Sequence, residues 1–438
     1  GQATTSISHM AEGVHQSVLG TLGLPGGAQP GQTRGLTGWV YQSIRGVTRL
    51  ADAGLQAGLA RLEPFFVPTA ADTAVHWERE AILAALNGVM GDRLQHDNNP
   101  LCTLMGWYQN GVRLETAALS RPLNAAARQA RPASIGSIPS ISGKVTGKLL
   151  VLVHGLCMND LQWQHEGHDH GAYLAEALGY TPVYLRYNTG LHTSTNGAQL
   201  SALLESLVAA WPAPVTELAV LAHSMGGLVA RSACEQAAHP AIHSAAPLSS
   251  LGPVGPLAPV SGAAGSRWLP LLRHLVFLGT PHHGAPLERA GHWVETLLGS
   301  TPYSRPFERL ARLRSAGITD LRYGHVLDAD WQGRHRFHTH TDQRAHVPLP
   351  AHVVCCAVAA TLAAQRSPVA ERLVGDGLVP LHSALGLHDD PQKTVGFAKN
   401  HQAVFYRLGH LALLSDERVA RQVAQWLQPA SQRNNADF

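Results

Sequence analysis

One serine of the chain, Ser224, stands in a pattern that can turn a hydroxyl group into a nucleophile. It lies in the segment AHSMGG (residues 222–227), between an apolar run and a pattern with helical periodicity. A sharp strand-to-helix turn exposes such a serine only if the residues two before and two after it are small. Gly226 meets this demand, and Ala222 replaces the first glycine of the G-x-S-x-G pattern. The segment predicts a nucleophile elbow, with a structural serine in a tight turn as the alternative.

A serine hydroxyl becomes a nucleophile only beside a base, and that base needs a carboxylate to fix its orientation. Where such a serine lies at the end of a strand of a mostly parallel sheet, the acid and then the histidine follow it along the chain. Asp376 lies in the segment GDGLVP (residues 375–380), and His410 lies between the last predicted strand and the closing helix. We therefore expect Ser224, Asp376 and His410 to form a catalytic triad. The rival acids and bases, which lie in less suitable places, are Asp328, Asp330, Asp389, Asp390, His382, His388 and His401.

The negative charge that develops on a substrate oxygen needs fixed donors, and backbone N–H groups serve because they need no reorganisation. Met225, directly after the serine, should supply one of them. The second should come from the loop after the strand that ends in His154-Gly155, where Leu156 is favoured and Cys157 is the nearby alternative. Since the protein supplies hydroxyl, base and donors, we expect neither a cofactor nor a metal.

Several other histidines lie near these segments. His282 and His283 follow a predicted strand at the same end of the sheet as Ser224, so we expect them, with His223, to line a substrate pocket. Three closely spaced imidazoles could in principle hold a metal ion, but a structural or surface role is favoured for them. They are His165, His168 and His170.

The elements that must position these residues begin near residue 140. From there short apolar runs alternate with helical patterns, which predicts an α/β fold with a mostly parallel central sheet flanked by helices. The predicted strands are 148–153, 181–187, 218–222, 274–279, 352–359 and 402–407, and the predicted helices are 199–210, 228–238 and 419–427. Two segments interrupt the alternation, 241–267 and 285–350. Long insertions are usually functional, and we expect these two to form a lid and the acyl pocket of a catalytic domain spanning 141–438.

Residues 1–140 are predicted to form a helical N-terminal extension. Apolar residues three and four positions apart mark one stripe of a helix over 36–62, and a second helix is predicted over 75–94. Arginines off the first stripe would suit contact with a membrane or lipid-granule surface, whereas its glycines favour packing on the protein itself. The segment 131–143, rich in Ser, Pro and Gly, is predicted to be a linker.

Composition excludes several other classes. A net charge of +3, from 33 basic and 30 acidic side chains, is too small for a nucleic-acid-binding surface. The five cysteines are odd in number and lack metal-ligand spacing. No apolar run approaches the ~20 residues of a membrane span, and the first residues show no export signal, so we expect a cytoplasmic protein.

At these motifs the chain resembles the bacterial lipase/esterase members of the α/β-hydrolase superfamily, including the GPI-inositol-deacylase-like lipases. The matching segments, found between about 148 and 427, are 151–156, 223–227, 279–286, 375–380 and 409–410. The resemblance implies an α/β-hydrolase fold, the same triad, and a small-molecule or lipid ester as substrate, with polyesters as one candidate class. The alternatives are an acyltransferase with the same triad and a catalytically silent lipid-surface-binding protein. The oligomeric state is not predicted.

Overall fold

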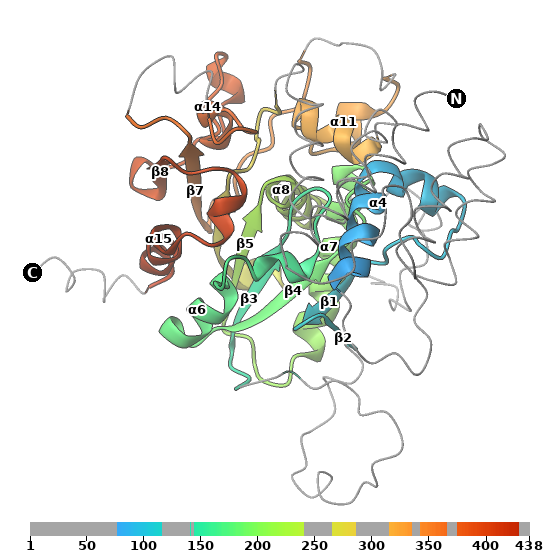
Figure 1. Ribbon diagram of the computed structural model, residues 1–438, viewed down its shortest axis with the longest axis vertical. Coiled ribbons are helices and arrows are strands. Elements are labelled where there is room, and N and C mark those ends of the chain that lie inside the picture. The colour runs from blue at the N-terminus through green and yellow to red at the C-terminus, as the bar shows by residue number, and fades with distance from the viewer. Residues whose placement is uncertain are drawn as a thin grey trace, which may run out of the picture.

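A mixed sheet of eight strands forms the centre of the protein in the computed structural model (Figure 1). The structure describes residues 77–115, 141, 144–240, 265–285, 315–334, 342–365 and 375–428. The strands are β1 (Gly106–Gln109), β2 (Val112–Leu114), β3 (Lys148–Val153), β4 (Thr181–Arg186), β5 (Glu217–His223), β6 (Leu272–Leu278), β7 (Val354–Thr361) and β8 (Gln402–Tyr406). Their order is β2-β1-β4-β3-β5-β6-β7-β8, and the six strands from β4 to β8 are parallel.

The helices connect these strands in the expected alternation. They are α4 (Trp77–His96), α6 (His170–Leu178), α7 (Thr193–Ala210), α8 (Met225–Ala238), α11 (Ala316–Tyr323), α12 (Asp328–Trp331), α14 (Leu381–Ala384) and α15 (Glu417–Leu427). Every predicted strand, and every predicted helix within the described residues, is confirmed, with bounds that differ by up to six residues. The predicted helix over 36–62, most of the predicted linker and the insertion up to residue 264 lie outside the described residues.

Side chains that alternate along β3 pack against two different helix layers. Leu149 and Val151 belong to the same apolar cluster as residues of α7 and α8. Leu150 and Leu152 belong to a second cluster, with residues of α6 and α15. Because successive side chains of a strand point to opposite faces, the sheet is covered by α7 and α8 on one face and by α6 and α15 on the other. This sandwich explains why β3 reads as a continuous apolar run.

The first third of the chain contributes two strands to the sheet, which the predicted division near residue 140 does not anticipate. β1 pairs antiparallel with β4, and β2 pairs antiparallel with β1. Asn110 and Gly111 connect them with φ of 52° and 75°, as a two-residue hairpin with two positive φ angles requires. Trp107 of β1 is buried in the same cluster as α7 and α8. Residues 106–114 are therefore part of the central sheet and not of a separate extension.

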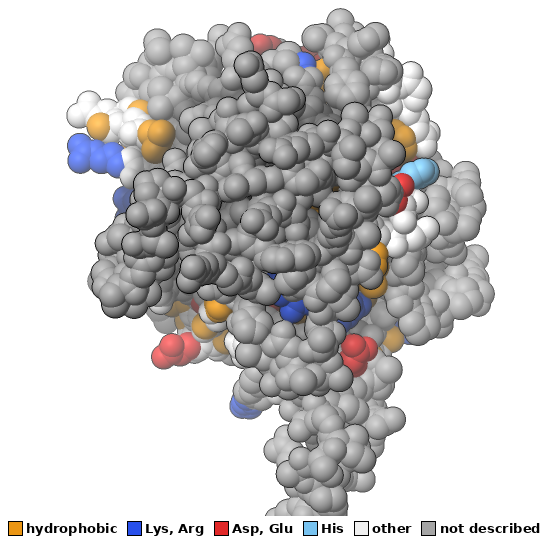
Figure 2. All heavy atoms as spheres, turned by 45° about the vertical axis from the view of Figure 1, so that its right-hand side comes forward, with side chains coloured by type: hydrophobic (Ala, Val, Ile, Leu, Met, Phe, Trp, Pro, Cys, Tyr) orange, Lys and Arg blue, Asp and Glu red, His pale blue; other side chains and the backbone are white. Residues whose placement is uncertain are grey.

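The described surface carries both signs of charge. In Figure 2 the Lys and Arg side chains of the described residues lie among Asp and Glu side chains around the rim of the view. Among the described helices, none is long and apolar enough to cross a membrane.

Candidate active site

Ser224 occupies the turn between β5 and α8 that the sequence predicts. Its backbone has φ of 55° and ψ of −125°, a region that residues other than glycine rarely adopt. The Ser224 N–H donates to the Leu278 carbonyl at 2.8 Å, which fixes the turn to the end of β6. A Cβ at Gly226 would lie 2.5 Å from the Val153 carbonyl oxygen, so only glycine lets α8 approach β3 this closely. The strand, turn and helix of a nucleophile elbow are all present.

Asp376 and His410 form a buried pair at the same edge of the sheet. The His410 Nδ1 and Asp376 Oδ2 atoms are 2.7 Å apart, and the two side chains are 2% and 1% exposed. The other carboxylate oxygen, Oδ1, accepts hydrogen bonds from the Leu378 and Val379 N–H groups at 2.9 and 2.7 Å. Because the carboxylate accepts a hydrogen bond from Nδ1–H, the lone pair of the His410 ring lies on Nε2.

The end of β6 brings the serine and the Asp–His pair to one place. Ser224 is hydrogen-bonded to Leu278, and the next residue, Gly279, has φ of 57°. A Cβ at Gly279 would lie 3.1 Å from His410 Nδ1 and 3.2 Å from Asp376 Oδ2. The Ser224 backbone and the Asp376–His410 pair therefore both lie against the Leu278-Gly279 segment, where the missing side chain of Gly279 leaves room for the pair. The Ser224 hydroxyl has no hydrogen-bond partner among the described residues.

His223, predicted to line the substrate pocket, has a different position. It is fully buried, and its Nε2–H donates to the His410 backbone carbonyl at 3.1 Å. The two rings lie 4.6 Å apart between centroids. Burial, followed by the charge of His410, holds the pKa of His223 well below its usual value, so His223 stays neutral. His223 therefore supports the backbone that carries His410 instead of facing a substrate.

The loop after β3 passes directly against the serine, as the predicted oxyanion site requires. A Cβ at Gly155 would lie 3.0 Å from Ser224 Cβ. The Cys157 N–H already donates to the Thr189 hydroxyl at 3.1 Å, which leaves Leu156 as the better-placed second donor. Met225 is the first residue of α8, where the N–H has no acceptor within its own helix and the helix dipole favours negative charge.

Sequence reasoning missed Thr189. It belongs to the Asn188-Thr189-Gly190 segment that follows β4 at the carboxyl edge. Binding groups of α/β sheets gather in the loops at that edge. The position of Thr189 shortly after a predicted strand could therefore have marked it as a candidate site residue.

Apolar side chains surround the donors. Leu156, Met225, Ile318, Leu378 and Val379 belong to one buried cluster. Two helices press on it. Gly317 of α11 packs against Met225, because a Cβ added to this glycine would lie 3.1 Å from the Met225 methyl group. Gly88 of α4 packs against Cys157, where an added Cβ would lie 2.3 Å from the sulfur. The helix predicted over 75–94 and part of the predicted insertion 285–350 therefore form the walls of this site.

His282 and His283 lie at the predicted edge of the sheet, where their rings contact arginine side chains. His282 is fully buried and its Nδ1 accepts from Arg231 at 3.4 Å, while Nδ1 of His283 accepts from Arg344 at 3.4 Å. Both histidines line a cavity whose walls contain neither Ser224 nor His410. The prediction that they line the substrate pocket is therefore not supported by their placement.

The group of three histidines near residue 168 ties α6 to the segment that follows His410. His170 is fully buried, its Nε2–H donates to the Leu413 carbonyl at 2.8 Å, and its Nδ1 lies 2.8 Å from His168 Nε2. His165 pairs with His168 only through the backbone. These contacts give His170 a structural role. The described part of the chain contains no group of three metal-binding side chains placed to hold an ion.

Comparison with known proteins gives distant structural neighbours only. No family model matches the chain, and no curated protein is similar enough in sequence to count as a relative. The chain is similar to a mature lipase of Bacillus licheniformis, with 17% identity over 65% of this chain and 96% of that one and a TM-score of 0.38. It is also similar to lipase B of Aspergillus fumigatus, with 12% identity over 70% and 57% of the chains and a TM-score of 0.36.

A third neighbour, described with novel epoxide hydrolases from hot-environment metagenomes, has 11% identity over 65% and 92% of the chains and a TM-score of 0.33. The predicted α/β fold is confirmed by this chain's own mostly parallel sheet with flanking helices.

Proposed function

We propose that this chain is a serine-dependent carboxylic-ester hydrolase of the lipase/esterase type that forms an acyl-enzyme on Ser224. The observation that carries the proposal is the placement of the elbow serine and the buried Asp376–His410 pair against the Leu278-Gly279 segment. A structural serine would have no need of a strained turn beside such a pair. The narrower likeness to GPI-inositol-deacylase-like lipases rests on the same motifs.

The mechanism follows from the positions of these groups. His410 Nε2 takes the Ser224 proton as Oγ attacks the ester carbonyl, and the N–H groups of Met225 and Leu156 stabilise the oxygen that becomes negative. His410 then gives the proton to the leaving alcohol, which leaves an acyl group on Ser224. Water, deprotonated by the same imidazole, attacks this acyl group, and the acid is released. Asp376 holds the ring and stabilises its charged form throughout.

The surroundings favour esters with an uncharged acyl part. The cluster beside the donors consists of buried apolar side chains, and a charged group placed there would lose its hydration without gaining a partner. The proposed substrates are therefore small-molecule or lipid esters, with polyesters among the candidates, and the reaction needs no cofactor.

Turnover of p-nitrophenyl butyrate and palmitate by the wild type, Ser224→Ala and Ser232→Ala tests the proposal. Ser232 is a matched control, because it is a second buried serine of α8 whose hydroxyl accepts from Gln236. Ser224→Ala should lower kcat by about 10⁵-fold or more, and Ser232→Ala should stay near wild type. Release of free acid distinguishes hydrolysis from transfer to an added alcohol. Folded wild type that turns over neither ester, or undiminished turnover by Ser224→Ala, would refute the proposal.

A further inference from the structure

Two neighbouring cavities lie beside the loop that follows β6, and neither Ser224 nor His410 is among their lining residues. The larger has a volume of about 210 Å³ and the smaller about 20 Å³, and they share His283 and Arg344. We call them together the basic pocket. Its titratable lining residues are Arg231, Arg322, Arg334, Arg344, Lys393, Asp330, Asp342, Tyr323, His282, His283, His325, His346 and His388.

Positive charge exceeds negative charge in this lining. Five arginine or lysine side chains face the cavities, against two carboxylates. Both carboxylates are already engaged. Asp342 accepts from Arg344 at 2.8 and 2.9 Å and lies 3.4 Å from the Lys393 ammonium, whereas Asp330 accepts from the Val326, Leu327 and Ala345 N–H groups at 2.8, 2.9 and 3.3 Å. The described lining residues therefore carry an excess of positive charge.

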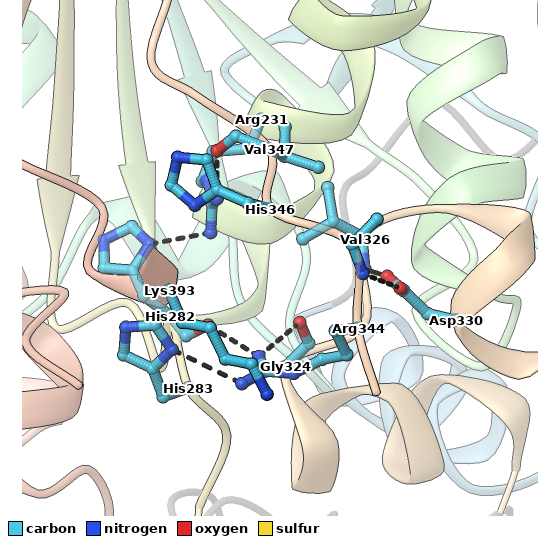
Figure 3. A pocket seen from close by; sticks show the side chains of 11 residues that line it. Arg231, His282, His283, Gly324, Val326, Asp330, Arg344, His346, Val347 and Lys393 are labelled. Carbon is cyan, nitrogen blue, oxygen red and sulfur yellow. Dashed lines mark hydrogen bonds between the residues drawn. The ribbon is translucent and has the colours of Figure 1, made fainter. Parts of the chain in front are cut away.

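Arg231 shows this surplus most directly. Its side chain enters the pocket from α8, 6% exposed, and donates to the Val347 carbonyl at 2.7 Å and to the His282 ring (Figure 3). Its Nε has no hydrogen-bond partner among the described residues, where Arg231 also forms no ion pair with a carboxylate. A buried guanidinium that lacks an anion is costly.

The neighbouring groups respond to the same positive field. Burial and then the charge of Arg344 lower the pKa of Arg231 to about 10. Burial lowers the pKa of His283 to about 4, and Arg344, His388 and Arg231 add to this effect. A bound anion would oppose the Coulombic part of both shifts.

We infer that the basic pocket binds a phosphate group. Guanidinium groups match the oxygens of a phosphate, and three of them, Arg322, Arg334 and Arg344, line the larger cavity against one carboxylate, Asp342. Arg231 faces the smaller cavity, which Arg344 also lines (Figure 3). The smaller cavity alone would hold a water molecule or two, whereas the volume of the larger, about 210 Å³, admits a phosphate together with part of the molecule that carries it. The phosphate belongs either to a soluble metabolite or to a lipid headgroup.

The pocket is joined to the candidate active site by one short loop. Gly279 contacts the Asp376–His410 pair, and His282 and His283 follow it by three and four residues. The His283 N–H donates to the Ser383 hydroxyl of α14 at 3.1 Å. A phosphate held here would lie at the same edge of the sheet as Ser224, but the inference does not depend on the reaction proposed for that serine.

Isothermal titration of the full chain with inorganic phosphate tests the inference, in the wild type, Arg334→Gln and Arg421→Gln. Arg334 lines the larger cavity at its half-buried rim, and Arg421, on α15 outside the pocket, is the matched control. Loss of one charge-assisted contact should weaken binding by about 10-fold in Arg334→Gln and not in Arg421→Gln. Because both positions are partly exposed, the variants should fold, and circular dichroism confirms this.

Sedimentation with phosphatidylcholine vesicles, with and without phosphatidic acid, separates the two sources of phosphate. Saturable binding of inorganic phosphate that Arg334→Gln weakens, without vesicle binding, assigns a soluble ligand. Binding to phosphatidic-acid vesicles that Arg334→Gln weakens and free phosphate competes away assigns a lipid headgroup. Absence of saturable binding in both experiments, or binding that Arg334→Gln leaves unchanged, would overturn the inference.

Discussion

The molecule contains two buried aspartates that each hold imidazole, and they serve different ends. Asp376 holds one histidine, His410, and its second oxygen is fixed by two backbone N–H groups. Asp320, fully buried in α11, holds two histidines, with Nδ1 of His192 and of His325 each 3.0 Å from a carboxylate oxygen. Its Oδ2 also accepts from the Thr193 N–H at 2.7 Å.

The two clusters differ in the residues that lie next to each histidine ring besides its aspartate. His410 belongs to the pair that lies against Gly279, beside the strained serine. His192 instead stacks on Trp331 of α12 at 3.6 Å between centroids. The Asp320 cluster therefore fastens α11 and α12 to the start of α7, and α11 in turn covers Met225. We therefore propose a catalytic role only for the pair beside Ser224, and a structural role for the Asp320 cluster.

The largest effect that separates the two clusters is expected for Asp376→Asn. Asparagine keeps an oxygen for the Leu378 and Val379 N–H groups, so the fold should survive, but it no longer fixes the His410 tautomer. We expect kcat on p-nitrophenyl butyrate to fall by about 10⁴-fold, measured in steady state with Asp320→Asn as the control. A decrease in kcat of less than tenfold would indicate that the Asp376–His410 pair has a structural role only.

Asp320→Asn should affect stability instead of chemistry. The change weakens two buried hydrogen bonds and removes the charge of their acceptor, which costs about 2 to 3 kcal/mol. Urea unfolding followed by tryptophan fluorescence measures this loss, and kcat per folded molecule should remain within a few-fold of wild type. Lost activity in a fully folded variant would contradict the distinction between the two clusters.

Acid should remove the stability difference between wild type and Asp320→Asn. Burial raises the pKa of Asp320, but the hydrogen bonds from His192 and His325 outweigh it, so the folded pKa lies below the ordinary value. A carboxyl with a lowered folded pKa contributes stability above its unfolded pKa, near 4, and loses it as the pH falls through the folded value. Urea midpoints should differ by a constant amount from pH 7 to 5 and converge below about pH 4. If the urea midpoints of wild type and Asp320→Asn moved further apart as the pH fell, the expected effect of Asp320 on stability would be contradicted.

The smallest effect is expected for His223→Phe, which removes the hydrogen bond to the His410 carbonyl. One buried hydrogen bond corresponds to about 1 kcal/mol, or a five-fold fall in kcat with KM unchanged. Since His223 remains neutral at ordinary pH, the pH dependence of kcat/KM should keep its shape. A shifted profile would show that His223 itself titrates during the reaction.

The sequence was most informative for residues whose role depends on their position next to a predicted strand. Ser224 directly follows β5, Asp376 lies in the connection between β7 and β8, and His410 follows shortly after β8, so chain order and context led to the prediction of these three residues. The hairpin of β1 and β2 was missed although Asn110-Gly111 is a strong turn signal, because its strands are only four and three residues long.

Contacts between distant segments were beyond prediction. Asp320 meets His192 across 128 positions of sequence, and with 26 histidines in the chain no spacing marks the right pair. Sequence placed His282 and His283 at the correct edge of the sheet. It did not give the direction of their side chains, which depends on Arg231 and Arg344 from α8 and the insertion.

The proposed mechanism requires that the acyl group be attached to Ser224. Treating the wild type and Ser224→Ala with a fluorophosphonate, then locating the adduct by peptide mass spectrometry, measures this directly. We expect one adduct per molecule, on Ser224, and none on Ser224→Ala. An adduct on another residue, or no adduct on folded wild type, would contradict the mechanism.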